Sequence, residues 1–200
     1  SAHTAYLTEA KKVTAARTKA APLLAQSITR AMQGLGMQGG QFQVALAPSA
    51  QPLQSGLEEI TFLVAGHAGS TPRAVGKVAS GGEISRIMLG FKKALAAGAN
   101  TCVMVFDEID TGISGHTAHI VGHKLKELSE KFQVVCISHL PQVAAYGDAH
   151  FRVEKAQQNG STESRIFRLD PAESEKEIAR LLSGAKLTPS SLQNARQLIE

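Results

Sequence analysis

The chain has 200 residues, of which 43% are hydrophobic and 19% are charged, a composition typical of a globular domain rather than of a disordered or fibrous protein. Its formal net charge is +4, and this excess lies in residues 1–30, which contain five basic side chains and one acidic side chain. Basic and acidic residues balance in the rest of the chain, so its charge is weak evidence for nucleic-acid binding by the body of the protein.

Apolar stretches and cysteines indicate the cellular compartment. No apolar run approaches the roughly 20 residues that cross a bilayer, and no basic start is followed by the apolar stretch of a secretory signal. Cys102 and Cys136 both lie in apolar, strand-like runs, where buried free thiols are a better explanation than a disulfide. We therefore expect a cytoplasmic protein with no membrane partner.

Residues 1–37 are expected to form a long helix, because apolar side chains recur at steps of three, four or seven residues. These side chains are Tyr6, Ala10, Val13, Ala20, Leu24, Ile28, Ala31 and Leu35. Pro22 interrupts the stripe, and we expect a break or a new first turn there, because proline lacks the N–H donor and clashes with the preceding turn. Since the stripe is rich in alanine, it predicts a thin surface that packs against a partner.

The middle of the chain alternates between strand and helix patterns. Strands are predicted over 42–47 and 59–65, with a Pro/Ser/Gln-rich loop between them and a polar loop over 66–78. A helix is predicted from Gly81 to about Ala97. Its apolar face contains Ile84, Ile87, Met88, Phe91 and Leu95.

A wholly apolar strand, 101–106, and a second apolar strand, 133–138, are linked by a predicted helix over 116–130. This connection predicts a parallel sheet that is covered on both faces. Residues 149–155 and 163–169 alternate and predict a hairpin. Two short helices follow, one near 173–182 and one that begins at Pro189 with Thr188 as its cap.

Two consecutive carboxylates, Asp107 and Glu108, end the first apolar strand. The carboxyl end of such a strand is where ligands of open α/β sheets bind. In P-loop ATPases an aspartate at this place joins the Mg²⁺ shell, and a following glutamate can polarise the attacking water. The alternative is a strand that ends in two solvated acids.

The segment Ser80-Gly81-Gly82-Glu83 opens the helix at 81–97. Ser80 and Glu83 have the spacing of a capping box, which is a sufficient structural explanation for those two residues. The two glycines lower helix propensity and leave the first turn bare, which favours close approach of an anion to the backbone N–H groups.

His139 ends the second apolar strand, and neighbouring strands would bring it close to Asp107 and Glu108. It could contact a γ-phosphate there, although a lone histidine at a strand end is often an ordinary surface residue. His119 and His123 have i,i+4 spacing suited to zinc, but the sequence suggests no third ligand. The chain contains no G-x₄-G-K-[ST] phosphate loop, so we expect it to need another segment to cradle phosphates.

Three motifs in this order, at 79–86, 103–112 and 136–144, resemble the ABC-type ATPase heads of SMC-like chromosome-maintenance proteins. The residues of these motifs are most similar to those of the RecN family of bacterial DNA repair proteins. The resemblance implies the C-terminal half of an α/β P-loop ATPase head, with a largely parallel sheet and flanking helices. It also implies two regions, a returning coiled-coil arm at 1–37 and the C-terminal lobe of the head at 38–200.

The resemblance further implies roles for individual residues. Asp107 would help hold Mg²⁺, Glu108 would be the general base, and His139 would be the switch histidine that senses the γ-phosphate. Ser80, Gly81 and Gly82, with Glu83 in support, would meet ATP bound to the opposite head. Asp110 would lie in the loop that crosses the dimer interface.

The implied function is ATP binding and hydrolysis at a head dimer, in repair of DNA double-strand breaks and recombination at the bacterial nucleoid. The implied partners are the N-terminal half of the same head with its phosphate loop (Walker A), a second head in an ATP-sandwiched homodimer, and DNA. The isolated chain would be inactive as an ATPase. A different class of function remains open, a non-catalytic module that binds DNA or a partner through the basic N-terminal helix. A fragment of an ABC transporter is a third possibility, which the motif wording disfavours.

Overall fold

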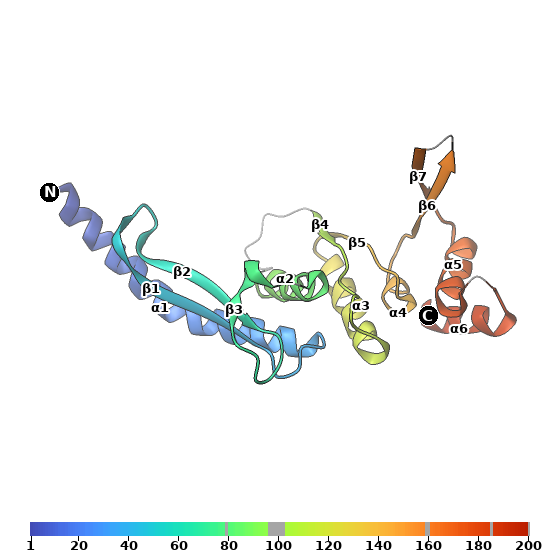
Figure 1. The fold of residues 1–200 in the computed structure, drawn as a ribbon, viewed down its shortest axis with the longest axis horizontal. Coiled ribbons are helices and arrows are strands. Elements are labelled where there is room, and N and C mark those ends of the chain that lie inside the picture. The colour runs from blue at the N-terminus through green and yellow to red at the C-terminus, as the bar shows by residue number, and fades with distance from the viewer. Residues whose placement is uncertain (79, 96–102, 159–160, 185, 200) are drawn as a thin grey trace. The chain divides into compact units, whose positions relative to one another are not determined.

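The computed structural model describes residues 1–78, 80–95, 103–158, 161–184 and 186–199 (Figure 1). They form two compact units, unit 1 (Ser1–Asn100) and unit 2 (Thr101–Glu200). Unit 1 contains α1 (Ala2–Gly34), β1 (Gln41–Leu53), β2 (Gly56–Ala65), β3 (Arg73–Ala74), the 3₁₀ turn η1 (Val75–Lys77) and α2 (Gly81–Leu95). Unit 2 contains β4 (Val103–Phe106), α3 (Gly115–Ser129), β5 (Gln133–Cys136), α4 (Pro141–Ala144), β6 (Phe151–Gln158), β7 (Ser161–Arg168), α5 (Pro171–Ser183) and α6 (Pro189–Ile199).

In unit 1, α1 runs along the antiparallel hairpin of β1 and β2 (Figure 1). The predicted apolar stripe makes this contact: Ala10, Ile28 and Leu35 are buried, and Ile28 belongs to the core of the unit. The remaining buried core residues are Met32, Met37, Phe42, Val64 and Ile87. The partner of the thin helix is therefore, at least in part, the hairpin that follows it in the chain.

Two proline positions differ from the sequence prediction. Helix α1 continues through Pro22 without a break. Thr18 lies one turn before Pro22 on the same side of the helix, and it is exposed. The Thr18 carbonyl that loses its helical partner lies on this exposed side and can bind water, so the break is not needed. Strand β1 likewise continues through Pro48 to Leu53 with a register shift, where the sequence predicts a loop. Because β1 is an edge strand, a proline without an N–H is tolerated there.

Aromatic side chains join α2 to the hairpin. Phe91 packs edge-on against Phe42 at 4.9 Å and against Phe62 at 5.6 Å, measured between ring centroids. Ile87, one turn before Phe91, is fully buried in the same core. Two other members of the predicted apolar face, Met88 and Leu95, are exposed, and residues 96–97 at the predicted end of the helix lie outside the described residues.

In unit 2, β4 and β5 pair in parallel as predicted, from Val103 opposite Gln133 to Phe106 opposite Cys136. Within the described part of unit 2, only one face of this pair is covered. Met104 and Phe106 point inward and are buried, whereas the opposite face exposes apolar side chains. The exposed fractions are 47% for Val103, 64% for Val105, 43% for Val135 and 57% for Ile137. Cys102 lies outside the described residues, and Cys136 is a free thiol.

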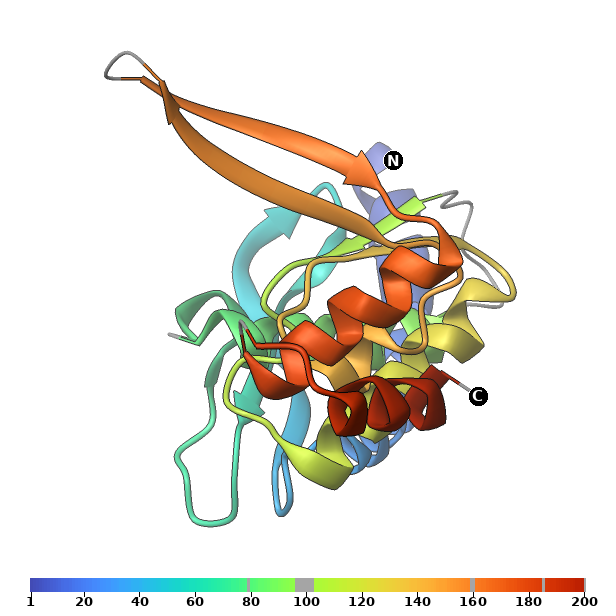
Figure 2. The same cartoon turned by 90° about the vertical axis from the view of Figure 1, so that its right-hand side faces the viewer.

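The other elements of unit 2 follow the predicted order, except that the short helix α4 was not predicted from the sequence. β6 and β7 form the expected antiparallel hairpin, which extends away from α5 and α6 (Figure 2). Helix α5 begins with a full capping box between Asp170 and Glu173. Helix α6 begins at Pro189, and the hydroxyl of Thr188 accepts the Ser191 N–H at 3.1 Å, as its predicted capping role requires. None of the described helices combines the length and the apolar character that a bilayer crossing needs.

Candidate active site

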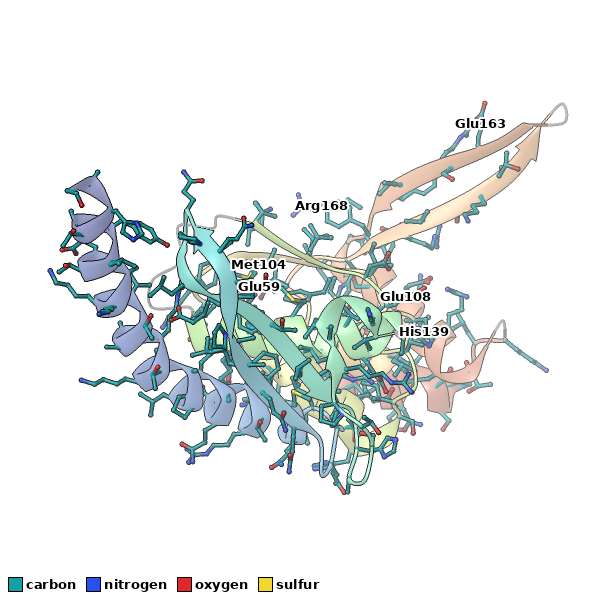
Figure 3. The ribbon with its side chains drawn as sticks, turned by 60° about the vertical axis from the view of Figure 1, so that its left-hand side comes forward. Glu59, Met104, Glu108, His139, Glu163 and Arg168 are labelled. Carbon is teal, nitrogen blue, oxygen red and sulfur yellow. The ribbon has the colours of Figure 1, made fainter. Side chains whose placement is uncertain are left out.

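The carboxyl ends of β4 and β5 carry the acidic and histidine motifs. The ladder between the two strands extends by one bond, because the Ile137 N–H donates to the Phe106 carbonyl at 2.9 Å. Asp107 and Ser138 therefore leave the parallel pair at the same edge. Figure 3 shows Glu108 and His139, which follow them, on the two loops at this edge. The sequence prediction that these motifs share one edge is confirmed within unit 2.

Glu108 has an unusual backbone. Its φ is +55°, and among the described residues it is the only non-glycine residue with positive φ. An L side chain in this left-handed region is strained by about 1–2 kcal/mol, and such strain concentrates at functional sites. The Glu108 carbonyl accepts the Thr111 N–H at 3.0 Å, which closes a tight turn. This turn leaves the side chains of Asp107 and Glu108 exposed while it buries Ile109 and Asp110.

Asp110 is the polar centre of this edge. Its side chain is only 1% exposed, and one carboxylate oxygen, Oδ2, accepts three hydrogen bonds from the loop after β5. The donors are the Ser138 hydroxyl at 2.6 Å, the His139 N–H at 2.8 Å and the Leu140 N–H at 3.0 Å. The family resemblance implies that Asp110 lies in a loop that crosses a dimer interface, and in this structure its side chain bonds to the loop after β5 inside unit 2.

The hydrogen bonds decide the charge of Asp110. Burial raises the pKa of its carboxyl, but the bonds from Ser138, His139 and Leu140 and the attraction of the His139 ring outweigh burial. The net effect lowers the pKa below its usual value, so Asp110 is ionised at neutral pH. A buried carboxylate with three donors is a fixed anchor for the loop that carries His139.

His139 projects from this anchor into solvent, with 67% of its side chain exposed. Its Nδ1 lies 3.2 Å from the Asp110 Oδ2, which directs the other ring nitrogen away from the carboxylate. Cys136 lies at the end of β5, close to these acidic groups. Burial raises the pKa of its thiol most, and the negative charges of Asp110 and Asp107 raise it further, to about 12. The thiol is therefore protonated and unreactive, and the edge is negatively charged.

The glycine-led motif opens α2 in unit 1. The Ser80 hydroxyl accepts the Glu83 N–H at 3.4 Å, and the Ser80 carbonyl accepts the Ile84 N–H, so the capping role of Ser80 is present. Gly81 is exposed at the first turn, whereas Gly82 is buried. Ala79 lies outside the described residues.

A cavity of about 300 Å³ adjoins this helix start. Ser80 and Glu83 line it together with the basic side chains of Arg73 and Lys77, while the Glu83 carboxylate lies beside Gly66. A helix N-terminus next to two cations suits an anion. Sequence reasoning missed Arg73 and Lys77 because residues 66–78 were predicted to be a polar loop without a motif, whereas Arg73 lies in β3 and Lys77 in η1.

Ser138 is a second residue that sequence reasoning missed. Nothing in the local sequence pattern predicts its bond to Asp110. The available signal is the small polar side chain directly after an apolar strand, opposite an acidic turn. The His119 and His123 rings, considered as zinc ligands, both pack edge-on against Tyr146, with centroids at 6.4 and 6.2 Å. Within the described ranges no group of three ligating side chains occurs.

Unit 2 presents two exposed carboxylates and one exposed imidazole at a strand edge. Oxygen ligands of this kind suit Mg²⁺, and an adjacent carboxylate suits proton abstraction from water. Unit 1 presents a helix start beside a cationic cavity, which suits phosphate. The residue types fit the magnesium and nucleotide that the resemblance implies.

Comparison with known proteins gives relatives over almost the whole chain, although no family model matches it. DNA repair protein RecN of Xylella fastidiosa is 44% identical over 194 residues, which are 96% of this chain and 35% of that protein. DNA repair protein RecN of Haemophilus influenzae is 38% identical over 192 residues, or 96% of this chain and 34% of that protein. The chain therefore spans about a third of the length of the curated relatives it matches.

Solved structures agree on the fold. The Smc head domain with a coiled coil and joint from Pyrococcus yayanosii superposes with a TM-score of 0.56 at 21% identity, over 80% of this chain and 29% of that one. The Smc head domain with an extended coiled coil from Pyrococcus furiosus gives a TM-score of 0.50 at 20% identity, over 78% of this chain and 37% of that one. The predicted α/β head fold is thus confirmed. We conclude that the chain is homologous, over almost its whole length, to one segment of the bacterial RecN proteins and that it has the fold of part of an SMC head.

Proposed function

We propose that the chain is the C-terminal half of an ATPase head of a RecN-like DNA repair protein. In this role it supplies the signature helix, the acidic strand end and the switch histidine, and a separate N-terminal half supplies the phosphate loop. The observation that carries the proposal is the edge of unit 2, where the strained Glu108 and the exposed His139 follow two paired strands and Asp110 ties their loops together. Such a protein would act at the nucleoid of a bacterial cell, in break repair and recombination.

The chemistry assigned to this edge is hydrolysis of the terminal phosphate of ATP. Glu108 accepts a proton from water as the water oxygen attacks the γ-phosphorus and the bond to the ADP oxygen breaks. His139 contacts an oxygen of the transferred phosphoryl group. Asp107 would hold Mg²⁺, which neutralises phosphate charge when bound. Asp110 stays outside the reacting groups and supports the loop of His139.

Ser80, Gly81, Gly82 and Glu83 are assigned to the nucleotide on the opposite head of a homodimer. The bare helix start and the adjoining cavity of about 300 Å³, which also presents Arg73 and Lys77, support this assignment. Ser80→Arg would place a bulky side chain there and is expected to abolish ATP-dependent dimerisation of complete heads. Ser27→Arg, on an exposed turn of α1, is the matched control. Equal dimerisation of both variants in size-exclusion chromatography would contradict the assignment.

The exposed apolar face of β4 and β5 is assigned to the N-terminal half of the head. Parallel strands of this composition are normally covered on both faces, and Val105 and Ile137 are more than half exposed in the described part of unit 2. The matched relatives are about three times longer than this chain, which leaves enough polypeptide to cover the face. Val105→Lys is expected to abolish co-purification with the P-loop half, whereas Ile166→Lys on the β6–β7 hairpin should not. If both variants still co-purify with the P-loop half, this face is not the surface that binds it.

The decisive test of the proposal is Glu108→Gln in a head completed with its P-loop half. The amide cannot accept the water proton, so hydrolysis is expected to fall by about 10²–10⁴, the usual contribution of a general base. Nucleotide binding should persist, and ATP-bound dimers should accumulate. Glu130→Gln, at the C-terminal end of α3, is the matched control and should hydrolyse ATP normally. Unchanged turnover in Glu108→Gln would remove Glu108 from this role.

DNA contact is assigned to α1. Lys11, Lys19 and Arg30 are exposed and make no ion pair among the described residues, whereas Lys12 pairs with Glu9 and Arg17 with Glu58. Each basic side chain that neutralises a DNA phosphate contributes about 0.9 to the slope of log affinity against log salt. The triple substitution of Lys11, Lys19 and Arg30 to glutamine should therefore flatten the salt dependence, and Lys12→Gln should change it less. An unchanged slope in the triple variant would exclude α1 as the DNA surface.

A further inference from the structure

The loop that carries His139 is held by a single buried carboxylate oxygen. Asp110 Oδ2 accepts the Ser138 hydroxyl and the backbone N–H groups of His139 and Leu140, at 2.6, 2.8 and 3.0 Å. The imidazole Nδ1 of His139 lies 3.2 Å from the same oxygen. The carboxylate thus contacts the backbone and the ring of His139 together.

The second oxygen of Asp110 makes the arrangement more specific. Oδ1 is buried and has no hydrogen-bond partner among the described residues. A turn residue that served only to close its own loop would place both oxygens on N–H groups or in water, since a buried polar atom without a partner is costly. The carboxylate is instead oriented toward residues 138–140, and this orientation requires an explanation beyond the local turn.

We propose that Asp110 is the positioning residue of His139, which fixes the ring so that Nε2 is the nitrogen presented to a phosphate. The inference rests on the proposed function only for the identity of that ligand. The carboxylate can only accept, so the contact with Nδ1 is favourable when Nδ1 carries a proton. The tautomer of a histidine is set by the group that one ring nitrogen faces, and here Nδ1 is the nitrogen that faces a carboxylate oxygen, at 3.2 Å.

This geometry defines how His139 can meet a phosphate. In the neutral ring Nδ1 holds the proton, and Nε2 carries a lone pair that a phosphate oxygen would repel. Nε2 donates to the phosphate only when both nitrogens are protonated, and the charged ring then lies between two anions, Asp110 and the phosphate. Asp110 therefore prepares His139 for a negatively charged ligand while remaining shielded from it, because its own side chain is 1% exposed.

The first test measures the ring itself, without nucleotide. In the 200-residue chain labelled with ¹⁵N-histidine, the two nitrogen shifts of His139 at pH 8 should show the Nδ1–H tautomer as the major form. Asp110→Asn, which keeps an acceptor but can offer an amide N–H to Nδ1, should make Nε2–H the major form. Ser138→Ala removes one donor from the carboxylate, keeps its charge, and should retain the wild-type tautomer.

The outcomes of this measurement decide the inference. Identical nitrogen shifts in the wild-type chain and in a folded Asp110→Asn variant would overturn it. If Asp110→Asn does not fold, the ¹⁵N shifts of the wild-type chain and of Ser138→Ala still test the inference. A predominant Nε2–H tautomer in the wild-type chain would contradict the geometry and overturn the inference. Failure of the Glu108→Gln test would reject the ATPase proposal but would leave this measurement unaffected, so the two failures are distinguishable.

The second test asks whether Asp110 acts through His139. In a head completed with its P-loop half, Asp110→Asn and His139→Gln should each lower kcat, by about 10². If Asp110 works only by positioning His139, the double variant should be no slower than the slower single variant, because coupled residues are not additive. Multiplicative losses would show an independent role for Asp110 and would overturn the proposal.

Discussion

Gly122, in the middle of α3, is the position where one added methyl group should disturb the candidate site from a distance. A Cβ at Gly122 would lie 2.9 Å from the Tyr146 Cε2 and 3.0 Å from the Gln142 carbonyl oxygen, and closer still to the Tyr146 Cδ2. The Tyr146 ring is flanked by His119 and His123, which restricts its retreat. Gly122→Ala therefore pushes α3 and α4 apart.

Two opposing energies determine the result. Replacing a helical glycine with alanine stabilises the helix by about 1 kcal/mol. Overpacking a close contact costs about 1–3 kcal/mol, and here one contact is with backbone, which yields less easily than a flexible side chain. We expect a net loss of about 1 kcal/mol in the free energy of unfolding of unit 2. Because α4 begins directly after Leu140, the backbone bonds from His139 and Leu140 to Asp110 should also open more often.

Native-state hydrogen exchange measures both effects, since it reports the opening free energy of each region separately. In Gly122→Ala, amides of α3 and those of His139 and Leu140 should exchange faster. Gly34→Ala has no atom within 4 Å of its added methyl group and should be neutral or stabilising. In a Tyr146→Ala background most of the overlap is absent, so Gly122→Ala should cost less. A Gly122→Ala chain that is more stable, with unchanged exchange at 139–140, would refute this reasoning.

Three further outcomes are expected. Pro22→Ala should stabilise α1 by about 1–3 kcal/mol in urea denaturation, because it restores a helical hydrogen bond at an exposed position where no packing is removed; a destabilised variant would contradict this. The pKa of Asp110 is lower in the folded than in the unfolded chain, so its contribution to stability is complete above about pH 4–5 and is lost as the pH falls through the folded value. Acid titrations should therefore show a shallower loss for Asp110→Asn than for the wild-type chain, and parallel curves would exclude the effect. In a Cys102→Ser background at pH 8, Cys136 should react with iodoacetamide about a thousandfold more slowly when folded than when unfolded, because its pKa rises to about 12; equal rates would show that the thiol is accessible and ionised.

The sequence was informative where a local pattern controls the structure. The apolar stripe of α1, the strands β4 and β5, the β6–β7 hairpin and the start of α6 at Pro189 all follow from periodicity and capping. The shared edge of Asp107 and His139 followed from the rule that parallel strands end together. These predictions needed no knowledge of which distant residues touch.

Tertiary context decided the rest. Pro22 and Pro48 are tolerated because one lies on an exposed side of a helix and the other on an edge strand, and neither fact is visible in the local sequence. Asp110 reads as part of a polar turn, and only the partners across the edge, Ser138 to Leu140, explain why it is buried. The bare face of Val105 and Ile137 could not be anticipated, because an apolar strand gives the same pattern whether or not a neighbour covers it.

The left-handed backbone conformation of Glu108 lowers the thermal stability of the chain at the position whose carboxylate is the proposed general base. Glycine adopts this conformation without the steric penalty of a side chain, so Glu108→Gly should melt at a higher temperature than the wild-type chain while it loses the carboxylate. A directed-evolution screen that rewarded heat resistance alone would thus enrich for a form that lacks the carboxylate proposed as the general base, so engineering that aims to keep this proposed role should hold residue 108 constant.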